Sequence, residues 1–170
     1  YAANLETGDR QMIYEGSFAN YPGAMSPDGR YVTVSQSRGE DSDDLALLNL
    51  ATGEFTQISA PERRAAHGSI AWQDDSSSFY LVSNRDHEYS ALMKFDVWTN
   101  SFSVIETAEH DIESVDLCGA DDRYLVWTVN EGGYSRLHTR DLETGETLDT
   151  PALAEGVYGV SCTDQSSRIL

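Results

Sequence analysis

Residues 26–58 read SPDGRYVTVSQSRGEDSDDLALLNLATGEFTQI and contain two tight turns joined by strand-like segments. The first turn is 26–29, and the second is 51–53. Proline at the second position of a turn presets φ and glycine accepts positive φ, so both turns have a physical cause. The segments between and after them are rich in Val, Tyr, Leu and Phe, with a charged loop at 38–44; they occupy residues 31–35, 45–50 and 54–58. The stretch therefore predicts a small antiparallel meander.

The same unit recurs along the chain, and the recurrence predicts the fold. The turn before each outer strand has Thr at its third position and occurs at residues 5–8, 50–53, 97–100 and 142–145. These threonines lie 45, 47 and 45 residues apart. The earlier turn recurs at 26–29, 73–76, 119–122 and, in degenerate form, 163–166. Four short strands in each ~40–50 residues are typical of a β-propeller blade. A repetitive β-sandwich is the alternative, and it is disfavoured because turns match at both places in the repeat.

We therefore expect an all-β chain that forms an arc of a β-propeller, with about three complete four-stranded blades and a partial blade at each end. The complete blades are predicted at 17–62, 63–107 and 108–150; the end of one blade is predicted at 1–16 and the start of another at 151–170. Closed propellers have about four to eight blades, so we expect the chain to be part of a larger protein. The first residue is Tyr1, and we expect the natural N-terminus to precede it.

Composition excludes several classes of protein. The 170 residues are 39% hydrophobic and 10% aromatic, which favours an ordered domain with a core over disorder. No apolar run approaches the ~18 residues of a membrane span, so no membrane partner is expected. The net charge of −18 disfavours nucleic-acid binding. The acids are spread along the chain, as in proteins of salt-adapted organisms, and their densest run, 40–44, lacks the residue order of a calcium loop. The compartment stays open between cytoplasm and periplasm.

The cysteines and histidines give no catalytic or metal signature. Cys118 and Cys162 hold similar places in successive blades, where their side chains are expected to face the packing between blades. A disulfide between them is possible, but buried free thiols are the commoner outcome at such positions. The histidines fall in different blades and are expected to be solvated or in turns; they are His67, His87, His110 and His138. No metal or cofactor is therefore expected.

Other conspicuous side chains are interpreted as structural. Four aromatic residues in predicted strands are expected in the core between blades; they are Trp72, Tyr80, Tyr124 and Trp127. Trp98 falls in a turn and is expected to be exposed or to pack locally. The charged segment 85–88 is expected to be a solvated loop.

Repeats of the form S-P-D-G-[KR]-x-hydrophobic, followed by L-D-L-x-T-G-E, resemble the propeller of the prolyl oligopeptidase family of serine peptidases. The last third of the chain is the most specific part of this resemblance. Residues 129–137, VNEGGYSRL, resemble the N-E-x-G-Y-S-x-L segment of bacterial and archaeal members. The segments DLETGE at 141–146, PAL at 151–153 and GVYGV at 156–160 follow in the family's order.

The resemblance implies a role next to a catalytic domain. In that family the propeller is a lid on an α/β-hydrolase domain that carries the Ser-Asp-His triad, and the lid admits peptides and excludes folded proteins. The implied partners are the protein's own C-terminal hydrolase domain, outside this chain, and peptide substrates. A nucleophilic serine needs a G-x-S-x-G elbow. The nearest segment, 159–163, lacks the second glycine and falls in a predicted inner strand. We therefore expect no catalytic residue and no enzyme activity in this chain, within a parent that is a serine-type oligopeptidase or exopeptidase.

Two other function classes stay open. A propeller of TolB or WD type would act as a protein-binding scaffold, and a propeller lactonase or lyase would need ligands that converge on the central channel. A G-x-S-x-G elbow after the last blade would establish the peptidase, a chain that ends at the propeller would favour the scaffold, and metal bound in the channel would favour the lactonase or lyase. We also expect self-association, because residues 1–14 supply outer strands and residues 157–170 supply inner ones, so that two chains can complete each other's blades.

Overall fold

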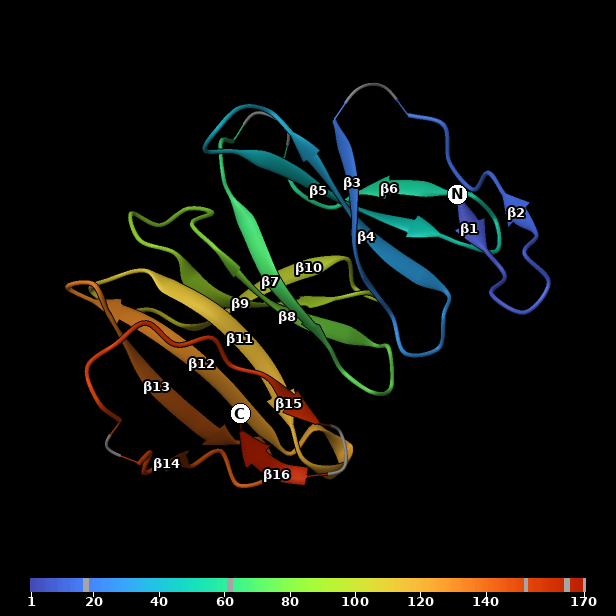
Figure 1. Cartoon of the computed structure of the whole chain (residues 1–170). Helices are drawn as coiled ribbons and strands as arrows, with labels where there is room; N and C mark the ends of the chain where they lie inside the picture. Colours follow the sequence, from blue (N-terminus) through green and yellow to red (C-terminus); the bar gives the residue numbers. More distant parts are fainter. Residues whose placement is uncertain (17–18, 61–62, 152, 164–165, 170) are drawn as a thin grey trace.

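A computed structural model of the chain describes residues 1–16, 19–60, 63–151, 153–163 and 166–169. Three four-stranded antiparallel sheets form most of this part of the chain (Figure 1). The first sheet contains β3 (Asn20–Met25), β4 (Tyr31–Ser37), β5 (Asp43–Asn49) and β6 (Phe55–Gln57). The second contains β7 (His67–Trp72), β8 (Ser78–Ser83), β9 (Ala91–Asp96) and β10 (Ser101–Glu106). The third contains β11 (Ile112–Cys118), β12 (Tyr124–Glu131), β13 (Tyr134–Asp141) and β14 (Thr147–Leu148).

A two-stranded sheet lies at each end of this series. At the N-terminal end β1 (Ala2–Ala3) pairs with β2 (Arg10–Gln11), and at the C-terminal end β15 (Cys162–Thr163) pairs with β16 (Ser166–Ile169). The helical structure in the described residues is one 3-10 turn, η1 (Ala120–Asp122). The prediction of an all-β chain built from four-stranded meanders is confirmed.

The sheets are arranged as successive blades of an arc (Figure 1). In each sheet every strand pairs with the next one along the chain, so each is a simple meander. The first strand of each sheet contacts the first strand of the next: β3 contacts β7, β7 contacts β11 and β11 contacts β15. This arrangement places the first strands on the inside of the arc and the fourth strands on the outside.

Apolar packing between the sheets forms two clusters of buried residues. The first cluster joins the first and second sheets; its members are Leu45, Leu47, Ile58, Trp72, Phe79, Leu81, Ala91, Met93 and Phe95. The second joins the second and third sheets; its members are Ala71, Tyr80, Val82, Leu92, Ile112, Val115, Leu117, Leu125, Trp127 and Val129. Three of the four aromatic residues predicted in the core lie in these clusters, and Tyr124 is only half-buried. Trp98 lies in a turn and is 71% exposed, as predicted.

The recurring Thr-containing turns have one structure. In each turn the side chain of an Asn or Asp at the end of the preceding strand accepts a hydrogen bond from the backbone N–H of the Thr; these residues are Asn4, Asn49, Asp96 and Asp141. The residue after the Thr has positive φ, between 50° and 76°, and is Gly or Asn. An Asx-turn followed by a left-handed residue therefore explains why this part of the repeat is the best preserved along the chain.

The connections between second and third strands differ between sheets. Gly132 and Gly133 join β12 to β13 as a two-residue hairpin turn, and both have positive φ (65° and 95°). The charged loop predicted to continue to residue 44 is wrong at its end, because β5 begins at Asp43. Asp44 there is buried, and its side chain forms an ion pair with Arg38. Pairing of this carboxylate makes its burial in a strand possible.

The C-terminal end also differs in detail. The predicted inner strand from residue 157 is wrong in its first part, since β15 begins only at Cys162. The degenerate turn predicted at 163–166 includes residues 164–165, which lie outside the described residues. The predicted blade boundaries at residues 17 and 62 and the chain end at 170 lie outside them as well.

Candidate functional site

Because each blade is a meander of four strands, the loops of all the sheets gather at two edges of the arc. We call the edge where the first strands begin the connection edge. It carries the loops between second and third strands and the connections between sheets; its described segments are 38–42, 84–90, 132–133, 58–60, 63–66, 107–111, 149–151 and 153–161. We call the opposite edge the turn edge. It carries the two families of repeated turns, at 26–30, 73–77, 119–123, 50–54, 97–100 and 142–146.

The connection edge ties each sheet to the next through the start of its third strand. The backbone N–H of Asp43 donates to the carbonyl of Ala65 at 2.9 Å. In the third sheet the N–H of Ser135 donates to the carbonyl of Gly156 at 2.9 Å. In the second sheet the residue before the third strand is Ser90, and its carbonyl accepts from the N–H of Ile112 at 3.0 Å. Equivalent positions therefore fix the entry of the chain into each following blade.

A cluster of charged residues surrounds the first of these ties, and we call it the charged junction. Asp43 uses both carboxylate oxygens: Oδ1 accepts from the backbone N–H of His67 at 2.8 Å and Oδ2 accepts from the hydroxyl of Ser35 at 2.6 Å. Arg38 forms an ion pair with Asp44, whose side chain is 3% exposed. The junction thus joins the first and second sheets through carboxylates that are buried or hydrogen-bonded.

His67 is the unusual member of the charged junction. Both of its ring nitrogens are buried and have no hydrogen-bond partner. Burial lowers the pKa of His67, and the nearby positive charge of Arg85 lowers it further, whereas Asp43 and Asp44 act in the opposite direction. The imidazole is therefore held in its neutral form, because its environment penalises the charged form.

Further charges of the charged junction come from the second sheet and from the connection that precedes it. The guanidinium of Arg85 lies over the ring of Phe102, 4.7 Å from its centroid. Asp86 forms ion pairs with Arg63 and with Arg85, the latter at 3.7 Å. The predicted solvated loop at 85–88 is therefore only partly correct, because the Arg85 side chain is 22% exposed and packs on the outer strand.

The structure separates the four histidines into two pairs. His87 and His110 lie in loops, as predicted. The prediction is wrong for His67, which begins β7, and for His138, which lies in β13 and stacks on Trp127 with centroids 5.4 Å apart. In the described part of the chain no group of three or more His, Cys, Asp or Glu side chains is placed to hold a metal ion.

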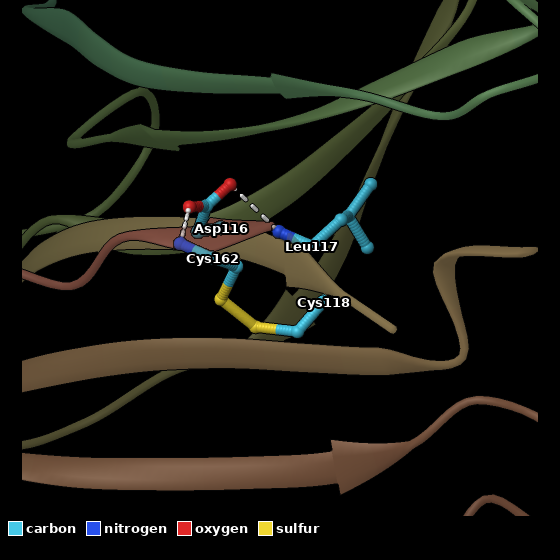
Figure 2. The surroundings of a disulfide bond; sticks show 4 residues. All are labelled: Asp116, Leu117, Cys118 and Cys162. Atoms are coloured by element: carbon cyan, nitrogen blue, oxygen red, sulfur yellow. Dashed lines mark hydrogen bonds between the residues drawn. A yellow bond between two sulfur atoms is a disulfide. The ribbon is translucent and has the colours of Figure 1, made fainter. Parts of the chain in front are cut away.

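The two cysteines are bonded to each other, so the expectation of free thiols is wrong. The Cys118–Cys162 disulfide joins the end of β11 to the start of β15, with Cα atoms 5.1 Å apart (Figure 2). That separation lies in the ordinary range for disulfides. The sequence indicated this contact, because Cys118 and Cys162 occupy equivalent positions in the inner strands of neighbouring blades. The segment 159–163, nearest in sequence to a serine elbow, ends in this bonded strand.

Among the described residues, no helix has the length and the apolar character that a membrane span requires.

The chain resembles solved propeller structures at low sequence identity. It matches a structure from a study of two prolyl endopeptidases with a TM-score of 0.73, at 17% identity over 92% of this chain and 24% of that one. A puromycin-hydrolysing peptidase of Mycobacterium tuberculosis gives 0.70, at 16% identity over 91% and 25%. TolB of Acinetobacter baumannii gives 0.61, at 14% identity over 85% and 35%. The chain thus spans about a quarter of the peptidases and about a third of TolB. No curated protein matches the chain.

A family model covers nearly the whole sequence. The model of the prolyl oligopeptidase N-terminal β-propeller domain matches residues 3–169. This match agrees with the four-stranded blades and with the resemblance carried by residues 129–137. The chain belongs to the prolyl oligopeptidase family, as part of its N-terminal β-propeller domain.

Proposed function

We propose that this chain is a non-catalytic part of a propeller that controls peptide access to the α/β-hydrolase domain of a serine peptidase. The observation that supports this proposal most directly is the family match over residues 3–169. The folds of two peptidase structures, with TM-scores of 0.73 and 0.70, agree with it. In this proposal the chain supplies shape and selective access, and the hydrolase domain supplies the nucleophile.

The topology suggests which edge of the propeller faces the hydrolase domain. A four-stranded meander brings the chain back to the edge at which it entered, so every blade starts and finishes at the connection edge. A domain that comes after a complete last blade would therefore attach on that side. We propose that the connection edge, including the loop 84–90 and the connection 107–111, faces the hydrolase domain.

Hydrogen exchange tests this orientation. Exchange would be measured on residues 1–170 alone and on the same residues in the full-length protein. Amides at 84–90 and 107–111 should be slower to exchange in the full-length protein. Those in the turn-edge segments 97–100 and 142–145 should exchange at equal rates in both, and they serve as the internal control. Protection of the turn edge instead would refute the proposed orientation.

A TolB-type scaffold is the second candidate function. It is supported by the TM-scores of 0.61 and 0.62 to TolB of Acinetobacter baumannii and putative TolB of Agrobacterium tumefaciens. The two candidates differ in the sequence after the propeller: a peptidase carries a G-x-S-x-G elbow between a strand and a helix, and a scaffold does not. The full-length sequence therefore decides between them.

A further inference from the structure

Three junctions link the three four-stranded sheets and the β15–β16 pair along the arc, and they are not held together in the same way. The two apolar clusters seal the first two junctions, between the first and second and between the second and third sheets. Among residues whose side chains are described, neither cluster extends beyond Leu142. Leu153 and Val157, in the connection to the β15–β16 pair, are 43% and 78% exposed. The third junction therefore lacks the apolar seal of the other two over the described side chains.

A covalent bond and a carboxylate hold the third junction. The Cys118–Cys162 disulfide joins β11 to β15, two strands that belong to different blades. Beside it, Asp116 accepts the N–H of Cys162 through Oδ2 and the N–H of Leu117 through Oδ1, both at 2.9 Å (Figure 2). Asp116 thus uses one oxygen on its own strand and one on the neighbouring strand.

At the corresponding place in the first junction, a tryptophan takes the position that a cysteine has in the third. There the indole N–H of Trp72 donates to the carbonyl of Ala24 at 3.3 Å, and the ring packs on Phe79 within the first cluster. In sequence, Trp72 precedes the early turn of its blade as Cys118 and Cys162 precede theirs. A large apolar side chain is therefore replaced by a reducible bond at the third junction.

The surroundings leave room for this bond to open. A cavity of about 280 Å³ lies beside Cys118; it is lined by Tyr124, Thr139, Leu148, Asp149, Thr150 and Pro151 as well as Cys118. Cys118 itself is only 1% exposed, whereas Cys162 is half-buried. Cys162 is therefore the more accessible of the two cysteines to an external thiolate, and Cys118 borders a space into which its freed thiol can move.

We propose that the Cys118–Cys162 disulfide is a redox-controlled clasp that docks the β15–β16 strand pair on β11. A dithiol reductant opens it: one thiolate attacks Sγ of Cys162, the bond between the sulfurs breaks, and Cys118 leaves as a thiolate that takes up a proton. The second thiol of the reductant then displaces Cys162 as a thiol and leaves the reductant as a disulfide. Two electrons and two protons pass to the protein, and a disulfide oxidant reverses the exchange.

Hydrogen exchange of oxidised and reduced protein tests this clasp. Before the measurement, iodoacetamide should label neither cysteine in oxidising buffer and both after treatment with dithiothreitol. Reduction should then speed exchange at the amides of Tyr158 and Cys162 by roughly 30-fold or more, the size expected for loss of a native disulfide. Exchange in β8 and β9, at the sealed junctions, should not change, since apolar packing holds them.

Two variants serve as controls. The double variant Cys118→Ser/Cys162→Ser should exchange like the reduced protein in both buffers. Asp116→Asn keeps the disulfide but alters the acceptor of the Cys162 amide, so it is read at Tyr158, whose amide donates to Ser135; exchange there should retain the full response to reduction. The proposal is overturned if the cysteines are alkylated without reductant, if reduction leaves exchange at Cys162 unchanged, or if it speeds exchange throughout β8 and β9. It is also overturned if Asp116→Asn alone opens the junction in oxidised protein.

Discussion

Truncation of Phe79 to alanine removes the centre of the packing between the first and second sheets. Phe79 is fully buried, and its ring lies 4.7 Å from that of Trp72 and 5.2 Å from that of Phe95, centroid to centroid. A Phe→Ala change in a core costs about 3–5 kcal/mol. The two aromatic contacts place Phe79 in the upper part of this range. For a chain of this size, a loss of about 4 kcal/mol lowers Tm by about 8–16 °C.

Urea unfolding followed by tryptophan fluorescence measures this loss. Trp72 lies against Phe79 and reports on this junction, and Trp127, buried in the second cluster, reports on the neighbouring junction; Trp98 is exposed in both states and contributes little. Val104→Ala is the matched control, because Val104 lies on the outer strand β10 and is 49% exposed. Its cost should stay within about 1 kcal/mol. A loss below about 1 kcal/mol for Phe79→Ala, or an equal loss for both variants, would refute this mode of packing between blades.

Individual residues lead to three other expected outcomes. Burial lowers the pKa of His67, so below the ordinary histidine pKa the unfolded chain takes up a proton that the folded chain does not, and stability falls as pH drops through this range. The urea concentration at the unfolding midpoint should therefore decrease as the pH is lowered from 7.5 to 5.5, and it should decrease less in His67→Phe. An equal decrease in both proteins would contradict this cause. Asp141→Ala removes the turn acceptor and the ion pair with Arg123, and it should lower the free energy of unfolding by about 1–3 kcal/mol. Asp141→Asn keeps the turn acceptor and should lower it less. Equal losses in the two variants would show that the turn acceptor has no role. Residues 1–170 should self-associate more readily as salt screens the net charge of −18, which light scattering over a salt series would detect; a monomer at every salt concentration, unaffected by deletion of residues 1–14, would contradict this.

The repeated turns made the fold predictable from the sequence, and the physical reason is local. An Asx side chain, a Thr and a left-handed residue specify a turn without help from distant contacts, so four copies appear in the sequence at nearly equal spacing. Alternating apolar residues then specified the strands between them. The start of β5 was missed because Asp43 and Asp44 are acidic, and distant partners allow them into a sheet: Ser35 and the backbone of His67 for Asp43, and Arg38 for Asp44.

Features that depend on contacts between blades were less predictable. His67 and His138 are held by neighbours 24 and 11 residues away in sequence, Asp43 and Trp127, and nothing local distinguishes them from solvated histidines. The disulfide was an open alternative because the places of Cys118 and Cys162 in the repeat suggested proximity without fixing their redox state. The catalytic machinery lies outside this chain in the proposed function, so no residue here could have revealed it.

Labelling with a fluorophosphonate, which modifies active serines, tests the central proposal most directly. Full-length protein and residues 1–170 alone would be labelled in parallel, digested and mapped, and both would be assayed with chromogenic dipeptide substrates. The proposal predicts a single labelled serine outside residues 1–170, turnover by the full-length protein that labelling abolishes, and neither label nor turnover for residues 1–170. A full-length protein without any reactive serine, or a labelled serine within residues 1–170, would contradict it.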